Sequence, residues 1–212
     1  MMAGLERGAF GGVLFTGYHA WGCCGGNPLS HTMTTACDQV TLNGVPASEF
    51  LINAYTALYF GVPVAFLSGD RELCAFAQDW LPGLVAVPVN EGRGGGVLSM
   101  HPQAAVEAIR AGAEEAVRRL RAGGAGMSVP LPRRFAATVR YKEHKDAYRR
   151  SFYPGARLED PRPSPLTRRT GTRCSGSAIS CCKEGEICRK RGISAWRCSS
   201  TRTTRPAPPW GT

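Results

Sequence analysis

The sequence predicts a mixed α/β fold in which helices cover both faces of a layered sheet. Two observations lead to this prediction. Along residues 1–160, short apolar runs of strand length alternate with segments whose apolar residues recur at helical spacing. Strands and helices that alternate in this way build α/β layers. From residue 161 the alternation stops. We therefore divide the chain into a domain at 1–160 and a C-terminal segment at 161–212.

The first elements are a strand, a hairpin and a helix. The apolar run Val13–Thr16 is typical of a buried strand. Asn43-Gly44 lies between two extended runs and indicates a hairpin turn. Ser48, or Ala47 beside it, then opens a helix. The apolar face of that helix consists of Phe50, Leu51, Ala54, Leu58 and Tyr59.

Three strands and one short helix follow. Residues 62–70 and 83–92 are apolar and of strand length, and residues 71–81 between them form a helix. Residues 134–144 begin with an alternating pattern that predicts a last strand. The Gly-rich stretch 91–99 matches no phosphate-binding motif, so we interpret it as a flexible loop.

The clearest helix is predicted over residues 101–124. Ser99 is the candidate cap near its start, and Gly123-Gly124 ends it. Its apolar stripe consists of Val106, Ile109, Ala113, Val117 and Leu120.

The positive charge is concentrated in the C-terminal segment. The net charge is +10, yet residues 161–212 carry eleven Lys/Arg against two Asp/Glu, whereas residues 1–160 carry fifteen against fourteen. The segment is rich in Arg, Ser, Thr, Pro and Cys and lacks a helix or strand period. Disorder and a shifted reading frame both explain it, and we favour the second. We rank nucleic-acid binding last among the candidate functions. It would use this segment and weaken steeply with salt.

Hydropathy and cysteine usage indicate a cytoplasmic chain. No stretch approaches the roughly 20 apolar residues of a membrane span. The first ten residues have neither a basic stretch nor a long apolar run, so we expect no secretory signal. None of the five cysteines beyond residue 160 forms a CxxC pair. We therefore expect reduced thiols rather than a zinc ribbon.

Two histidines and a glutamate suggest part of a metal site. His19 and His31 lie in the Gly-rich stretch 15–33, and Glu49 follows. Imidazole nitrogen and carboxylate oxygen are ligands that zinc prefers. The residues alone leave a structural role open for each. A histidine at a strand end is usually structural, and a glutamate in the first helical turn is favoured by the helix dipole.

Other polar residues receive simpler interpretations. Asp70 and Glu91 follow strands and are expected to pair with neighbouring arginines, although support of the site stays open. Cys23-Cys24 could touch a metal, but ordinary packing is the better expectation. His101 is expected at the surface.

The motifs together resemble one enzyme family. GYHA at 17–20, SHTM at 30–33 and the block N-G-x-x-x-S-E-x-x-x-N-A-Y at 43–55 occur in this order. They resemble the D-aminopeptidases of the DppA type, and the resemblance extends from about Leu5 to Leu158. It implies a cytoplasmic metallopeptidase with two zinc ions. Such an enzyme releases N-terminal D-amino acids such as D-Ala from short peptides, and it works inside a ring-shaped homo-oligomer.

The resemblance also implies roles for individual residues. It makes His19 a zinc ligand and Glu49 a second ligand of the same ion. His31 takes the place of the catalytic histidine, as nucleophile or general base. Asn53 and Tyr55 fall in the motif helix beside the site, and we assign them no catalytic role.

The chain also departs from the family pattern. The family begins with a strand that carries an Asp-x-Glu pair, which ligates and bridges the metals, and it has a further ligating histidine. Here the chain begins at MMAGLERGAF, and residues 161–212 stand where a strand and a helix are expected. We therefore expect a truncated member whose sheet lacks the first strands and whose activity is lost or impaired. The alternative is a non-catalytic remnant, either a pseudoenzyme or an assembly partner.

Overall fold

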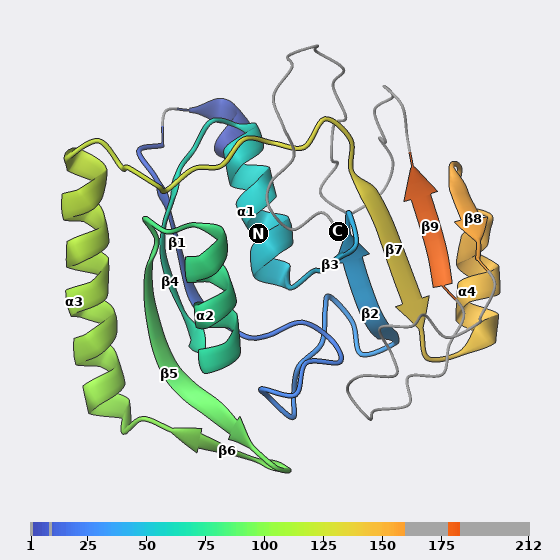
Figure 1. Ribbon diagram of the computed structural model, residues 1–212, viewed down its shortest axis with the longest axis horizontal. Helices are drawn as coiled ribbons and strands as arrows, with labels where there is room; N and C mark the ends of the chain where they lie inside the picture. The colour runs from blue at the N-terminus through green and yellow to red at the C-terminus, as the bar shows by residue number, and fades with distance from the viewer. Residues whose placement is uncertain (1, 9, 160–177, 183–212) are drawn as a thin grey trace.

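The fold consists of two neighbouring β-sheets with helices around them (Figure 1). The computed structural model describes residues 2–8, 10–159 and 178–182. The strands are β1 (Val13–Tyr18), β2 (Cys37–Leu42), β3 (Val45–Pro46), β4 (Val64–Asp70), β5 (Val85–Arg93), β6 (Gly96–Ser99), β7 (Ala136–Tyr141), β8 (Ala156–Leu158) and β9 (Ala178–Cys182). The helices are α1 (Glu49–Tyr59), α2 (Arg71–Trp80), α3 (Pro102–Arg121) and α4 (His144–Ser151), and a 3-10 turn, η1, covers Leu5–Arg7.

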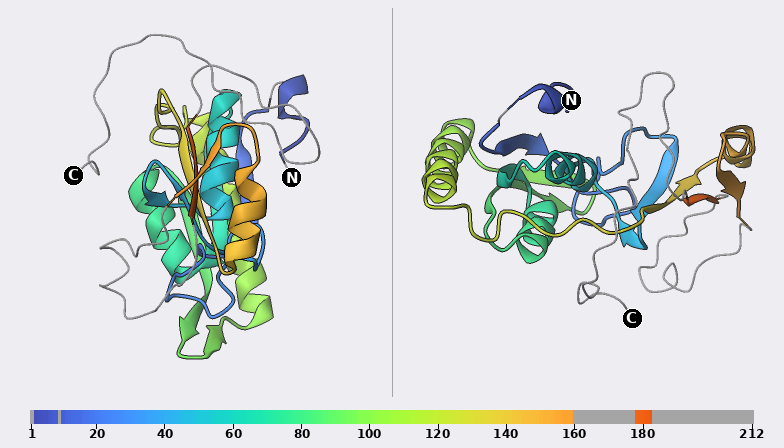
Figure 2. Two further views of the ribbon diagram at one scale, coloured as in Figure 1. Left: turned by 90° about the vertical axis from the view of Figure 1, so that its right-hand side faces the viewer. Right: turned by 90° about the horizontal axis from the view of Figure 1, so that it is seen from above.

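The first sheet has the order β1-β4-β5-β6, and the second has the order β3-β2-β7-β9-β8. Strands β1, β4 and β5 are parallel, β6 runs antiparallel to β5, and the pairs of the second sheet are antiparallel. Helix α3 lies at one end of the molecule and α4 at the other, as the views in Figures 1 and 2 agree. The predicted α/β class is confirmed.

Helices cover both faces of the first sheet, as the sequence predicts. Leu67 of β4 belongs to a buried cluster with Phe50 of α1 and Leu73 of α2. Its neighbour Phe66 belongs to a second cluster with Ala116 of α3. Adjacent strand residues point to opposite faces, so α3 lies on the face opposite to α1 and α2.

The hairpin and the cap of α1 follow the sequence prediction. Asn43 and Gly44 have φ values of 51° and 81° and join β2 to β3 in the register Leu42↔Val45. Positive φ at both turn residues is the geometry that Asn-Gly favours in a two-residue hairpin. The Ser48 side chain accepts a hydrogen bond from the Leu51 N–H and caps α1.

The region before α3 differs from the prediction. Residues 91–99 are not a loop, because β5 continues to Arg93 and pairs with β6 across a tight turn. Ser99 ends β6, and the N-cap of α3 is His101, whose ring accepts a hydrogen bond from the Gln103 N–H. The imidazole reaches the Gln103 N–H, the first free N–H group of the helix. Ser99 lies before His101, too far from this group to cap the helix.

The buried face of α3 is rotated from the predicted stripe. Gly112 and Ala116 are buried, whereas Val106 and Val117 are 52% and 37% exposed. Only a glycine lets the helix lie this close to the sheet. A Cβ atom at Gly112 would lie 2.7 Å from a Val87 methyl group and 2.8 Å from the Phe66 ring. Ile109 and Leu120 of the predicted stripe do pack against the cluster of Phe66 and Ala116, but hydrophobicity alone also selects the two exposed valines and misses Gly112.

Valine at position 112 is expected to destabilise the domain. Gly112→Val inserts a branched side chain into this contact, and overpacking of a core costs about 1–3 kcal/mol. Urea denaturation should show that loss in the free energy of unfolding. Ala111→Val on the exposed side of the same helix is the matched control. Equal stability of the two variants would contradict the close contact.

The second sheet contains elements that the sequence does not predict. The predicted strand at 134–144 is β7, which ends at Tyr141, and α4 begins at His144. Strand β9, at 178–182, lies between β7 and β8. The expectation of no regular structure in 161–212 is therefore wrong for these five residues, and the rest of that segment lies outside the described residues. Within the described part of the chain, no helix is long and apolar enough to cross a membrane.

Candidate metal centre

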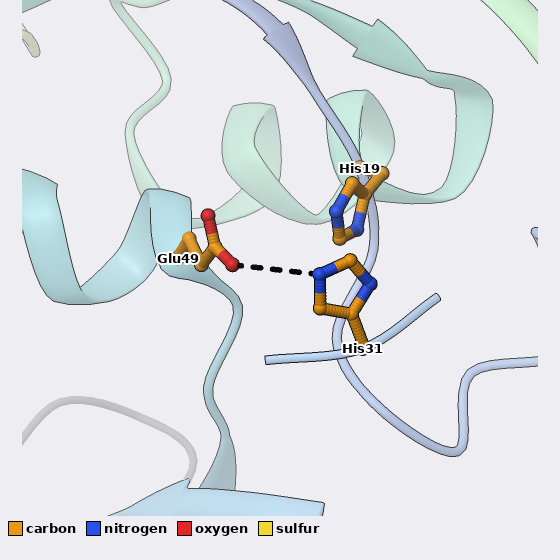
Figure 3. Close-up of side chains that lie close together, drawn as sticks. All are labelled: His19, His31 and Glu49. Atoms are coloured by element: carbon orange, nitrogen blue, oxygen red, sulfur yellow. Dashed lines mark ion pairs between the residues drawn. The ribbon is translucent and has the colours of Figure 1, made fainter. Parts of the chain in front are cut away.

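Three segments bring His19, His31 and Glu49 together. His19 directly follows β1, His31 lies in the loop between β1 and β2, and Glu49 is the first residue of α1. The loop leaves the first sheet for the second, and α1 leads back to the first. The site therefore lies where the two sheets meet, and Figure 3 shows the three side chains facing one another.

The three side chains are close enough to share a metal ion. One potential ligand atom from each lies within 4.8 Å of the others. His31 Nε2 and Glu49 Oε1 are 3.9 Å apart, and the two imidazole ring centres are 4.4 Å apart. The side chains of His31 and Glu49 are 34% and 24% exposed, so the cluster is half-buried and open to a small ligand.

The hydrogen bonds of the imidazoles leave one nitrogen of each ring available. His19 Nδ1 lies 2.9 Å from the Ala20 carbonyl oxygen, and His31 Nδ1 lies 2.9 Å from the Leu29 carbonyl oxygen. A carbonyl oxygen only accepts, so in the neutral ring Nδ1 carries the proton. The lone pair is then on Nε2, where it can bind a metal or accept a proton.

The Glu49 carboxylate is held by the backbone of the His31 loop. The Met33 N–H donates to Glu49 Oε1 at 3.0 Å. Met33 has a φ of 64°, a left-handed conformation that is unfavourable for a non-glycine residue. Such backbone geometry is held by surrounding contacts and is common at functional sites. The other carboxylate oxygen, Glu49 Oε2, takes no part in this hydrogen bond.

The donor set fits zinc. Two imidazoles and one carboxylate form a ligand combination that catalytic zinc sites use, with a further position open for water or substrate. Zinc ligands lie about 2.0–2.2 Å from the ion, so tetrahedral neighbours are roughly 3.3 Å apart. His31 Nε2 lies 3.9 Å from Glu49 Oε1, so His31 can serve either as a further ligand or as a base beside an ion held by the other two residues.

Thr32 connects the three segments, and the sequence analysis missed it. Its side chain is 1% exposed. The hydroxyl oxygen accepts a hydrogen bond from the Gly22 N–H at 3.2 Å, and the hydroxyl donates to the Ala47 carbonyl oxygen at 2.8 Å. Thr32 thereby fixes the His31 loop against both the segment after His19 and the approach to α1. The only sequence signal was its place in the SHTM motif.

Asp70 does not pair with an arginine as expected. It is fully buried, and its Oδ1 accepts a hydrogen bond from the Leu73 N–H at 2.8 Å, which caps α2. Glu91 is the carboxylate that pairs with arginines, and it contacts both Arg93 and Arg71. The hydrogen bonds from Arg93 and then Arg71 lower the pKa of Glu91. The other carboxylate oxygen of Asp70, Oδ2, contacts the segment after His19, where it accepts a hydrogen bond from the Ala20 N–H.

Tyr18 is a second polar group that the sequence analysis missed. Its hydroxyl accepts a hydrogen bond from Asn53 Nδ2 at 3.0 Å. Burial raises the pKa of the Tyr18 phenol, the hydrogen bond from Asn53 lowers it in part, and the negative charge of Glu49 makes a smaller raising contribution. Tyr55 lies elsewhere, with ring centres 5.0 Å from those of Trp80 and Phe135, so it belongs to the core.

The cysteines among the described residues lie outside the cluster. The Cys23 thiol contacts the carbonyl and the carboxylate of Asp38 at 3.3 and 3.2 Å. Cys74 is buried, and burial, with a smaller contribution from Asp70, raises its thiol pKa to about 12. Among the described residues, the one group of three or more metal-binding side chains is His19, His31 and Glu49.

Comparisons with known proteins show the family and the fold. The sequence matches the D-aminopeptidase family over residues 1–171. A D-aminopeptidase of Bacillus subtilis (strain 168) is 34% identical over 91 residues, which are 43% of this chain and 32% of that protein. The solved structure of the Zn-dependent D-aminopeptidase DppA from Bacillus subtilis, a self-compartmentalizing protease, has a TM-score of 0.66 at 22% identity. That match covers 82% of this chain and 57% of the other, and at this identity it shows the fold. The chain thus spans about a third of the curated relative and just over half of the solved one.

Proposed function

Since the chain belongs to the D-aminopeptidase family, we propose that it carries out zinc-dependent release of N-terminal D-amino acids, such as D-Ala, from short peptides. The observation that carries this proposal is the convergence of His19, His31 and Glu49, whose ligand atoms lie within 4.8 Å of one another. The solved relative is described as Zn-dependent, and the donor set here suits that ion.

In the proposed mechanism, His19 and Glu49 would hold zinc and His31 would move the proton. Zinc bound there would supply a Lewis acid for the peptide carbonyl and for the attacking water. His31 has its Nδ1–H engaged by the Leu29 carbonyl oxygen, so Nε2 can accept the proton of the attacking water. The same imidazolium can then donate that proton to the leaving amine.

The direct test is hydrolysis of matched peptides. We expect the zinc-loaded chain to release D-Ala from D-Ala-D-Ala, to leave L-Ala-L-Ala intact, and to lose activity on dialysis against a chelator. Readdition of Zn²⁺ should restore the activity. Liquid chromatography of the free amino acid measures each step. Equal cleavage of both peptides, or activity that survives chelation, would contradict the proposal.

A second candidate is a non-catalytic member of the family. Two-metal hydrolases clamp their ions between shared ligands, whereas the described residues bring only three ligand groups together. This candidate predicts less than one zinc ion per chain and no release of D-Ala. Zinc stoichiometry measured by elemental analysis, together with the peptide assay, separates the two candidates.

The proposed assembly and location follow the family. The solved relative is described as self-compartmentalizing, and we propose that this chain forms a homo-oligomer. Light scattering of the purified chain tests the assembly. The cytoplasmic location predicted from the sequence stays a proposal, and so does the expectation that nucleic acid is no partner.

A further inference from the structure

We propose that Asp70 is a positioning residue for both histidines of the metal centre. Asp70 is 0% exposed and lies at the end of β4, beside the end of β1 in the register Tyr18↔Gly69. Its Oδ1 caps α2 and its Oδ2 is directed toward the segment that carries the histidines. The inference rests on the proposed function, because it assigns Asp70 a task within that same site.

The first connection leads from Asp70 to His19. Asp70 Oδ2 accepts a hydrogen bond from the Ala20 N–H at 2.7 Å. The carbonyl oxygen of the same residue, Ala20, lies 2.9 Å from His19 Nδ1. A hydrogen bond to a charged acceptor is stronger than a neutral one. The carboxylate therefore fixes the residue whose carbonyl oxygen orients the His19 ring.

The second connection leads from Asp70 to His31. The same Oδ2 accepts a hydrogen bond from Asn27 Nδ2 at 3.2 Å. Asn27 Oδ1 in turn accepts from the Leu29 N–H at 2.9 Å, and the Leu29 carbonyl oxygen lies 2.9 Å from His31 Nδ1. Asn27 is itself buried, so this connection is shielded from water and depends on protein partners.

Both connections have the same chemical consequence. Each ends on a carbonyl oxygen that holds the proton of an imidazole on Nδ1 and leaves the Nε2 lone pair free. The hydrogen-bond partners of the ring nitrogen that does not bind the metal fix the tautomer and orientation of a metal-binding histidine. Their loss typically costs about 10–100-fold in metal affinity. A single buried carboxylate thus sets the same tautomer on two histidines that lie twelve residues apart.

Two variants test the connections separately. Asp70→Ser keeps an oxygen that can cap α2 and removes the acceptor of Ala20 and Asn27. Asn27→Ala interrupts only the connection to His31. Met127→Ala, in the buried cluster that contains Phe66 and Ala116, is the control for a general loss of stability.

The readout is the tautomer of each histidine in the metal-free full chain at pH about 8, from ¹H–¹⁵N correlations of the ring nitrogens. We expect His19 and His31 to carry the proton on Nδ1. His101 should carry it on Nε2, because its Nδ1 accepts from Gln103, and it serves as an internal reference. Asp70→Ser should give mixed tautomers at both site histidines, Asn27→Ala at His31 alone, and Met127→Ala at neither. Unchanged ring signals in Asp70→Ser, or equal changes in Met127→Ala, would overturn the proposal.

Zinc affinity provides the second readout. Asp70→Ser is expected to bind Zn²⁺ about 10–100-fold more weakly than the unaltered chain, and Met127→Ala should bind as the unaltered chain does. If the unaltered chain binds no zinc, the proposed function fails. The tautomers then still decide whether Asp70 positions the histidines.

Discussion

Replacing His19 by alanine is expected to weaken Zn²⁺ binding by more than about 100-fold, beyond the usual cost of losing an outer-shell partner. His19 Nε2 is one of the two zinc donors in the proposed site, and its ring is already oriented by the Ala20 carbonyl oxygen. Glu49→Ala should have an effect of similar size, because it removes the carboxylate that offsets the charge of the ion. Competition with a chromophoric chelator at constant pH measures both affinities.

His31→Ala is the matched comparison for this experiment. If His31 is the proton acceptor rather than a ligand, this variant should keep zinc affinity within about tenfold of the unaltered chain. It should lose the release of D-Ala, since general base catalysis contributes about 10²–10⁴-fold to the rate. A loss of zinc affinity as large as that of His19→Ala would show instead that His31 is a third ligand. Thermal unfolding of the metal-free variants checks that each still folds.

Thr32→Val is expected to lower the free energy of unfolding by about 2–6 kcal/mol. The hydroxyl is buried, and its loss leaves the Gly22 N–H and the Ala47 carbonyl oxygen without that partner. Each buried polar group left unpaired costs about 1–3 kcal/mol. Valine has nearly the same shape, so the effect reports the hydroxyl rather than packing. Chemical denaturation of the metal-free chain measures it.

Thr32→Ser separates the two contributions of threonine. It keeps the hydroxyl and removes only a methyl group, so we expect it to cost at most about 1.5 kcal/mol, as for small deletions of buried carbon. If serine destabilises as much as valine, the methyl contact and not the bridge holds the loop. Zinc affinity should follow the same order, because the hydroxyl joins the His31 loop to the approach of Glu49.

The sequence predicted the parts of the site that depend on local pattern. The Ser48 cap places Glu49 at the start of a helix, and the apolar run before His19 forms a strand. The supporting contacts were not predictable in this way. Asp70 and Ala20 are 50 residues apart, and Thr32 and Ala47 are 15 apart, so no spacing rule connects them. The short motifs contain some of these residues but do not predict which groups form hydrogen bonds with one another.

The amino-acid sequence by itself determined the α/β class, the Asn43-Gly44 hairpin and the segments that carry His19, His31 and Glu49. These features depend on periodicity, turn chemistry and capping, which act over a few neighbouring residues. Only the tertiary structure decided which face of α3 is buried, that residues 178–182 join the second sheet, and that Asp70 lies behind both histidines. Those outcomes depend on close packing and on the pairing of buried polar groups between distant segments, and such pairings exist only after the chain has folded.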